Sequence, residues 1–203
     1  TVWLALVVLE IIAFANYNMT KTNRKLIGID IFAGAGGLSL GAELAGISMR
    51  YAVECDPHAA ASYRRNFKKA TVFCEDIRKL STEPMKSEPV FIIMGGPPCQ
   101  GFSLSNTKTR DMSNPNNRMF EEFLRFVDDI KPTWFLFENV YGLTKFKNGD
   151  ENIQKHIEDR FRALGYTVNS DVLYASDYGV PQRRNRLFIV GNRNGIKFEF
   201  PEK

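Results

Sequence analysis

The sequence predicts an α/β fold, a doubly wound sheet with helices on both of its faces. Residues 26–32 indicate a first buried strand that leads into a glycine-rich turn and then a helical pattern over 38–45. Residues 90–94 and 133–137 are short, continuous apolar runs, which is typical of buried parallel strands. Between them, apolar residues recur at helical spacing over 119–130. With 203 residues, the chain is long enough for one such domain with a real core.

The charge and cysteine content narrow the classes of function. A formal net charge of +4 permits nucleic-acid binding but does not require it. The three cysteines, Cys55, Cys74 and Cys99, show no CxxC spacing, and the chain has two histidines. We therefore expect neither a metal site nor a disulfide framework, and we expect a reducing compartment.

The N-terminal stretch is an apolar run from Val2 to Ala15, interrupted only by Glu10. It is shorter than the ~20 residues of a membrane span and lacks the flanks of a signal peptide, so we predict a helix and no membrane association. From Met19 onward the sequence reads as an ordinary polar start before the first strand. We therefore treat residues 1–18 as a separate apolar helix and 19–203 as the main domain.

The first strand, the turn and the helix form the kind of unit that binds a nucleotide cofactor in doubly wound folds. Gly34, Gly36 and Gly37 would let backbone N–H groups approach a ligand at a helix N-terminus. The turn is not GxGxxG, because no glycine stands at Ser39, and this disfavours a dinucleotide. Taken alone, such a turn is also compatible with a purely structural role.

Two further predicted strands end in acidic residues. The strand over 49–53 runs into Glu54, some 20 residues after the turn, where α/β folds hold ribose hydroxyls. Asp56 already has a structural explanation as the N-cap of the next helix, so Glu54 is the better ligand candidate. The short strand over 71–73 leads to Asp76, which could bond an adenine amino group or simply cap a turn.

Cys99 follows two glycines and two prolines, which places it on a rigid corner after the strand over 90–94. A buried structural cysteine is the common alternative, but this corner favours a nucleophile held at a fixed height above the sheet. The strand over 133–137 delivers Glu138 and Asn139 to the same edge. Burying a carboxylate there costs free energy unless it is paired or has a functional role.

Two polar segments complete the predicted edge. Residues 104–117 form a long stretch without apolar periodicity, which we interpret as a loop that closes over a substrate. Arg183, Arg184 and Arg186 precede the apolar strand over 187–190. They could be a solvated charge run, or they could grip a phosphate or a base carbonyl.

Together these stretches resemble the C5-cytosine DNA methyltransferases that use S-adenosylmethionine. Four segments match the family's motifs in the family's order: Asp30-Ile-Phe-Ala-Gly-Ala-Gly-Gly-Leu-Ser, Gly-Pro-Pro-Cys99-Gln-Gly-Phe-Ser, Glu138-Asn139-Val140 and Gln182-Arg-Arg-Asn-Arg186. One such match would be weak, whereas four in order are specific. The resemblance implies a Rossmann-like methyltransferase fold.

The resemblance also implies roles for individual residues. Cys99 would attack cytosine C6, Glu138 would hold the ring at N3, and Arg186 would contact the exocyclic oxygen. Arg184 would favour the thiolate, and Asn139 would orient the nucleophile loop. The residues that would bind S-adenosylmethionine, and its product S-adenosylhomocysteine, are Asp30, Phe32, Gly34, Gly36, Leu38, Glu54, Asp76, Ile77 and Pro98.

The implied substrate is double-stranded DNA with the target base flipped out of the helix, in a bacterial cytoplasm or nucleoid and within restriction-modification. The family normally continues into a target-recognition region, and the sequence ends near where that region would start. We therefore expect a second polypeptide to supply recognition. Residues 8–14 resemble the family's last motif in a displaced or permuted position. A tRNA substrate, or a non-catalytic cofactor-binding subunit, remains an alternative.

Overall fold

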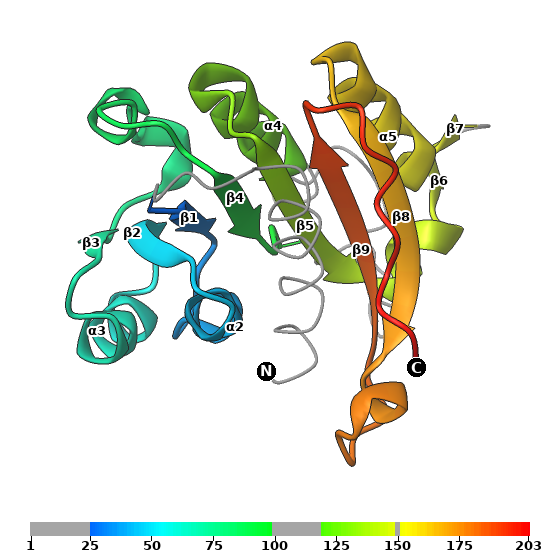
Figure 1. The fold of residues 1–203 in the computed structure, drawn as a ribbon, viewed down its shortest axis with the longest axis horizontal. Helices are drawn as coiled ribbons and strands as arrows, with labels where there is room; N and C mark the ends of the chain where they lie inside the picture. The colour runs from blue at the N-terminus through cyan, green and yellow to red at the C-terminus, as the bar shows by residue number, and fades with distance from the viewer. Residues whose placement is uncertain (1–24, 99–118, 149–150) are drawn as a thin grey trace.

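A seven-stranded sheet is the centre of the molecule (Figure 1). The structure is a computed structural model, and it describes residues 25–98, 119–148 and 151–203. The strand order across the sheet is β3-β2-β1-β4-β5-β9-β8. The strands are β1 (Ile27–Ile31), β2 (Ser48–Val53), β3 (Thr71–Phe73), β4 (Ile92–Gly95), β5 (Trp134–Val140), β8 (Thr167–Tyr174) and β9 (Asn185–Asn192).

Four described helices flank this sheet. They are α2 (Gly37–Leu44), α3 (Pro57–Asn66), α4 (Met119–Ile130) and α5 (Ile153–Ala163). A two-stranded hairpin of β6 (Lys147–Asn148) and β7 (Glu151–Asn152) precedes α5. The bounds of α4 and β3 are those expected from the sequence.

The first five strands run parallel, as the apolar runs indicate. β1 is buried at all five positions and pairs in parallel with β2 on one side and β4 on the other. Parallel neighbours need crossover connections, and helices α2 and α3 supply them around β2. Asp56 caps α3 by accepting a hydrogen bond from the backbone N–H of Ala59 at 2.7 Å, which confirms its structural role.

The last two strands are antiparallel to their neighbours. β9 pairs antiparallel with both β5 and β8, because a short turn-rich connection joins β8 to β9 without a crossover helix. The pairing reaches Val140 opposite Arg186, so β5 is longer than the predicted strand over 133–137. Glu138 and Asn139 therefore lie within β5, and Arg186 lies within β9 rather than before it.

Side chains alternate between the two faces of the sheet, and helices cover both faces. In β5, Phe135 and Phe137 belong to one buried cluster, with residues of α4 and α5. Trp134 and Leu136 belong to a second cluster on the opposite face, with residues of α2. Tyr63 of α3 and Phe67, which directly follows α3, pack against Ala52 on that same face. This two-sided cover is the doubly wound arrangement predicted from the sequence.

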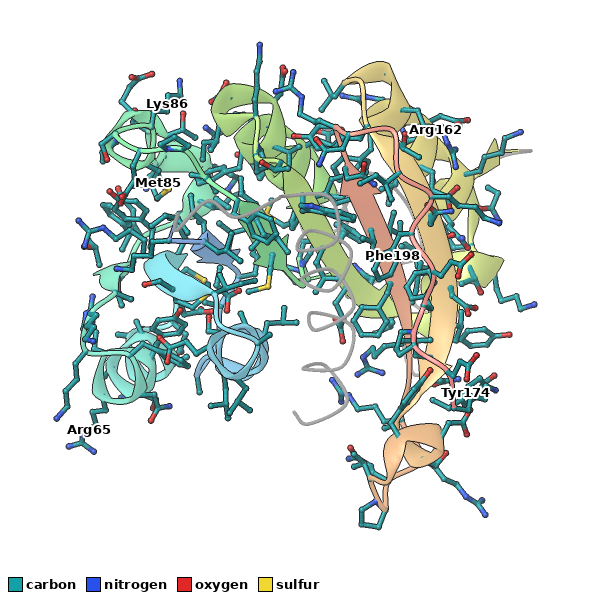
Figure 2. The ribbon with its side chains drawn as sticks, viewed as in Figure 1. Arg65, Met85, Lys86, Arg162, Tyr174 and Phe198 are labelled. Carbon is teal, nitrogen blue, oxygen red and sulfur yellow. The ribbon has the colours of Figure 1, made fainter. Side chains whose placement is uncertain are left out.

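The C-terminal segment runs across the sheet beside β8 and β9 (Figures 1 and 2). Phe198, labelled in Figure 2, is 2% exposed, and its ring lies 6.0 Å from that of Trp134, centroid to centroid. Asn169 fixes this segment by accepting a hydrogen bond from the Phe198 N–H at 2.9 Å.

Some expectations fall on residues outside the described ranges. These are the apolar helix over 2–15, the loop over 104–117 and the nucleophile candidate Cys99. The described chain reaches Pro98 and resumes at Met119. Within the described ranges, no helix is long and apolar enough to cross a membrane.

Candidate active site

A pocket lies at the carboxyl ends of β1, β2 and β3, where open α/β sheets bind ligands. Five residues that the sequence analysis assigned to a cofactor line it: Phe32, Glu54, Asp76, Ile77 and Pro98. The structure adds wall residues that the motifs did not indicate: Val53, Cys55, Glu75, Arg78 and Met119. The wall therefore combines an apolar surface with several carboxylates, which suits a ligand that carries both apolar and hydroxyl-bearing parts.

Phe32 reaches this pocket through an unusual backbone conformation. Its φ is 60°, in the left-handed region that bulky residues rarely adopt. Such strain costs ~1–3 kcal/mol and persists where the surroundings enforce it, often at functional sites. Here it turns the chain sharply after β1, so that the aromatic side chain joins the pocket wall.

The Glu54 carboxylate is held by two backbone amides. Oε2 accepts a hydrogen bond from the N–H of Gly34 at 2.8 Å, and Oε1 accepts one from the N–H of Asp56 at 2.8 Å. One amide belongs to the glycine turn and the other to the start of α3. A carboxylate oxygen can accept more than one hydrogen bond, so Glu54 is fixed in place and can still accept from a ligand hydroxyl.

Two other predicted cofactor residues, Gly36 and Leu38, pack against neighbouring side chains instead of lining the pocket. Gly36, the N-cap of α2, has a φ of 94°, and a Cβ placed there would collide with the Phe67 ring. Leu38 is partly buried and packs against the core on the α2 side of the sheet. Gly36 and Leu38 are not among the described residues that line the pocket, so the structure gives both a packing role.

Asp30 is fully buried beneath the turn and does not line the pocket. Its Oδ2 accepts a hydrogen bond from the Ser39 hydroxyl at 2.6 Å, and the Ser39 and Tyr63 hydroxyls are also 2.6 Å apart. Asp30 Oδ1 has no hydrogen-bond partner in the described structure. Burial raises the pKa of Asp30 from 3.8 to about 7. This network ties β1 to α2 and α3.

Asp76 both lines the pocket and caps the turn that follows it. Its Oδ1 accepts the backbone N–H of Arg78 at 3.0 Å, and the Arg78 guanidinium pairs with both carboxylate oxygens. These Arg78 hydrogen bonds hold the pKa of Asp76 at about 2. The carboxylate is thus ionised, and both roles considered from the sequence are compatible with the geometry.

A second cluster of predicted residues meets on β5 and β9. Arg186 Nε lies 3.0 Å from Glu138 Oε1, and Arg184 Nη2 lies 3.9 Å from the same oxygen. The side chains of Glu138 and Arg186 are 18% and 19% exposed, and Arg184 is 43% exposed. Burial raises the pKa of Glu138, while the two guanidinium groups oppose that rise. A carboxyl of raised pKa suits a group that shares a proton with a substrate.

The segment leading to Cys99 runs between the pocket and this cluster. A Cβ on Gly96 would lie 3.0 Å from Glu138 Oε2, and Pro98 lines the pocket. Asn139 Nδ2 donates a hydrogen bond to the carbonyl of Pro97 at 3.2 Å. Asn139, 3% exposed, therefore anchors the chain two residues before Cys99, although Cys99 itself lies outside the described residues.

Comparison with known proteins identifies the family. The sequence model for "C-5 cytosine-specific DNA methylase" matches residues 26–203. The chain belongs to this family. It is 39% identical over 179 residues to Type II methyltransferase M1.HphI of Haemophilus parahaemolyticus, which covers 86% of this chain and 48% of that relative. It is 40% identical to M.AquIA of Picosynechococcus sp., over 86% of this chain and 75% of that relative.

Solved structures show the same fold. A prophage-encoded E. coli protein named as a DNA modification methyltransferase matches with a TM-score of 0.70 and 36% identity, over 83% of this chain and 47% of that one. A Spodoptera frugiperda DNMT2 variant matches with a TM-score of 0.68 at 23% identity, which speaks to the fold alone. The predicted Rossmann-like fold is thereby confirmed. The chain spans about half the length of M1.HphI, so the whole protein's activity is not given by these matches.

Proposed function

We propose that this chain transfers a methyl group from S-adenosylmethionine to C5 of cytosine in duplex DNA. The observation that carries the proposal is the Glu138–Arg186 pair, which lies beside the segment that runs from Gly96 to the pocket wall at Pro98. A carboxyl group, a guanidinium group and the segment that leads to the Cys99 thiol thus lie at one edge of the sheet. That is the set of groups that addition to a pyrimidine ring requires.

The pocket residues fit the proposed cofactor. Phe32, Ile77 and Met119 offer apolar contact for an adenine ring, and Glu54 offers a fixed acceptor for ribose hydroxyls. Asp76 is an ionised acceptor at the wall, suited to an amino group. When bound, the cofactor supplies an electrophilic methyl on a sulfonium. Within the described residues, no group of three or more His, Cys, Asp and Glu side chains is placed to hold a metal.

The proposed reaction begins at Cys99. Its thiolate forms a bond to C6 of the cytosine, and the displaced ring electrons make C5 nucleophilic while charge builds toward N3 and the exocyclic oxygen. Glu138 holds and shares a proton at N3, and Arg186 stabilises the oxygen. C5 would attack the sulfonium methyl carbon, and the methyl–sulfur bond would break with its electron pair left on sulfur, which gives S-adenosylhomocysteine. A base then removes the C5 proton, and the S–C6 bond breaks to restore the thiolate.

Access to these atoms requires the base to leave the duplex. Asn139, through Pro97, would keep the thiol at the height where a flipped ring can meet it. The expectation that a second polypeptide supplies target recognition stays a prediction. Size-exclusion chromatography with light scattering, on protein purified from its native host, would test it.

The decisive experiment measures transfer of a radiolabelled methyl group to unmethylated plasmid DNA and, in parallel, to tRNA. We expect transfer to DNA and its loss, by at least ~10³-fold, in Cys99→Ala, because the covalent route needs the thiolate. Cys74→Ala is the matched control, since Cys74 is exposed and does not line the pocket. Duplex containing 5-fluorocytosine should trap the wild type covalently, because fluorine cannot leave C5 as a proton does. Activity surviving Cys99→Ala would reject the mechanism, and transfer to tRNA alone would reject the substrate.

A further inference from the structure

We propose that Arg125, a residue of α4 outside the family's motifs discussed above, positions the Asp76–Ile77 turn so that the pocket selects adenine. This inference rests on the proposed function, because it assumes that the pocket binds an adenosyl cofactor. It adds a positioning residue that acts through the pocket wall rather than touching the ligand.

The contact itself is a guanidinium on two backbone carbonyls. Arg125 Nη2 donates a hydrogen bond to the carbonyl of Ile77 at 2.8 Å and to that of Leu80 at 3.3 Å. These carbonyls belong to the 3₁₀ turn Ile77–Lys79 and the residue after it. Arg125 therefore holds both the first residue of the turn, Ile77, and the residue after it, Leu80. Asp76 and Ile77, where the turn begins, line the pocket.

Arg125 is held in place by its own helix. Its Nε donates to Glu122 Oε2 at 2.8 Å, its Nη1 lies 3.8 Å from Asp129 Oδ2, and its guanidinium lies 4.9 Å from the centroid of the Phe126 ring. The side chain is 34% exposed. A planar guanidinium can make these contacts at once, whereas a lysine ammonium is a compact charge without the same fork.

The turn is thus braced from two directions. Arg78, itself part of the pocket wall, holds the Asp76 carboxylate, and Arg125 holds the backbone from α4. α4 also contributes Met119 to the pocket wall, about 9 Å along the helix from Arg125. A carboxylate held this firmly can accept from the 6-amino group of adenine but not from the 6-oxo group of hypoxanthine, which presents an acceptor.

The test measures discrimination between two ligands rather than binding alone. Isothermal titration gives the Kd of the full-length chain for S-adenosylhomocysteine and for S-inosylhomocysteine, its 6-oxo analogue. We expect the wild type to prefer the adenine ligand by about tenfold or more, because the 6-oxo group would face the ionised Asp76 carboxylate as acceptor against acceptor, with no proton to share. In Arg125→Lys we expect that preference to fall to about threefold or less, with little change for the inosine ligand.

Arg162→Lys is the matched control. Arg162, labelled on α5 in Figure 2, makes comparable ion pairs with Glu158 at 2.9 Å and Asp159 at 2.8 Å and does not line the pocket. It should keep the wild-type preference. Glu122→Gln removes the carboxylate that holds Arg125 and should lower the preference for the adenine ligand by about two- to threefold. This second variant tests the proposal if Arg125→Lys does not fold.

The outcomes separate the two proposals. Equal weakening of both ligands in Arg125→Lys, or an unchanged preference there and in Glu122→Gln, would overturn the positioning role while leaving the proposed function intact. A wild type that binds both ligands equally would also overturn it. A wild type that binds neither ligand would reject the proposed cofactor, and this inference with it.

Discussion

The buried carboxyl of Asp30 has one paired oxygen and one unpaired oxygen. An ionised carboxylate without full hydrogen bonding is expensive in the interior, so the folded protein favours the protonated form. That is the physical cause of the rise in the pKa of Asp30 to about 7. The sequence shows an aspartate at the end of an apolar strand. It does not show that the Ser39 hydroxyl of α2 donates to one of its oxygens, or that Ser39 is in turn hydrogen-bonded to the Tyr63 hydroxyl of α3.

Asp30 should make the folded state less stable as the pH rises. Between pH ~4 and ~7 the folded state holds a proton that the unfolded state has released, so the free energy of unfolding falls across this window, by roughly 4 kcal/mol at most. Asp30→Asn removes the titration. Urea unfolding at pH 5 and pH 8 should show a smaller loss of stability in the variant than in the wild type. Identical losses would show that Asp30 does not hold the proton.

At the scale of the element, the turn between β1 and α2 should contribute to stability through Gly36 more than through Gly37. Gly36→Ala combines a φ of 94° with a collision against Phe67, so we expect it to lower the free energy of unfolding by ~1–3 kcal/mol. Gly37→Ala is the matched control, because a Cβ there meets nothing within 4 Å and adds helix propensity at the start of α2. Urea denaturation compares the two, and equal losses would contradict this account.

Elements that local patterns define could be predicted from the sequence. α4 has apolar residues at helical spacing, and its bounds match the expectation. The end of β5 could not be predicted, because it is set by pairing with β9, some 46 residues further along the chain at Val140–Arg186. The antiparallel direction of β9 was missed for the same reason. The backbone conformation of Phe32 could not be predicted either, because a bulky residue gives no local signal for a φ of 60°.

At the scale of the whole molecule, the site consists of two halves on one rim of the sheet. The half that we propose to bind the cofactor comes from β1, β2 and β3, and the half that we propose to bind the base comes from β5 and β9. Motif order in the sequence indicated both halves, because carboxyl ends of parallel strands share an edge. The supporting roles of Arg125 and Arg78 could not be predicted from motifs, because their partners are backbone carbonyls and a turn carboxylate.

A substitution in one half of the site should leave the function of the other half nearly unchanged. Glu54 follows β2 and Glu138 lies in β5, three strand spacings away, or about 14 Å across the sheet. Substitutions at sites that far apart, with no shared partner, usually have additive effects.

Glu54→Gln should weaken S-adenosylhomocysteine binding by about tenfold or more. The glutamine side chain keeps only one oxygen, which cannot accept hydrogen bonds from both the Gly34 and Asp56 amides and also from a ribose hydroxyl. Glu138→Gln should leave that Kd within about twofold while lowering the single-turnover methylation rate by at least ~10²-fold. Titration calorimetry and rapid-quench assays on the same preparations separate binding from chemistry. A tenfold loss of cofactor affinity in Glu138→Gln would show instead that the Glu138–Arg186 pair and the segment from Gly96 to Pro98 form one unit with the pocket.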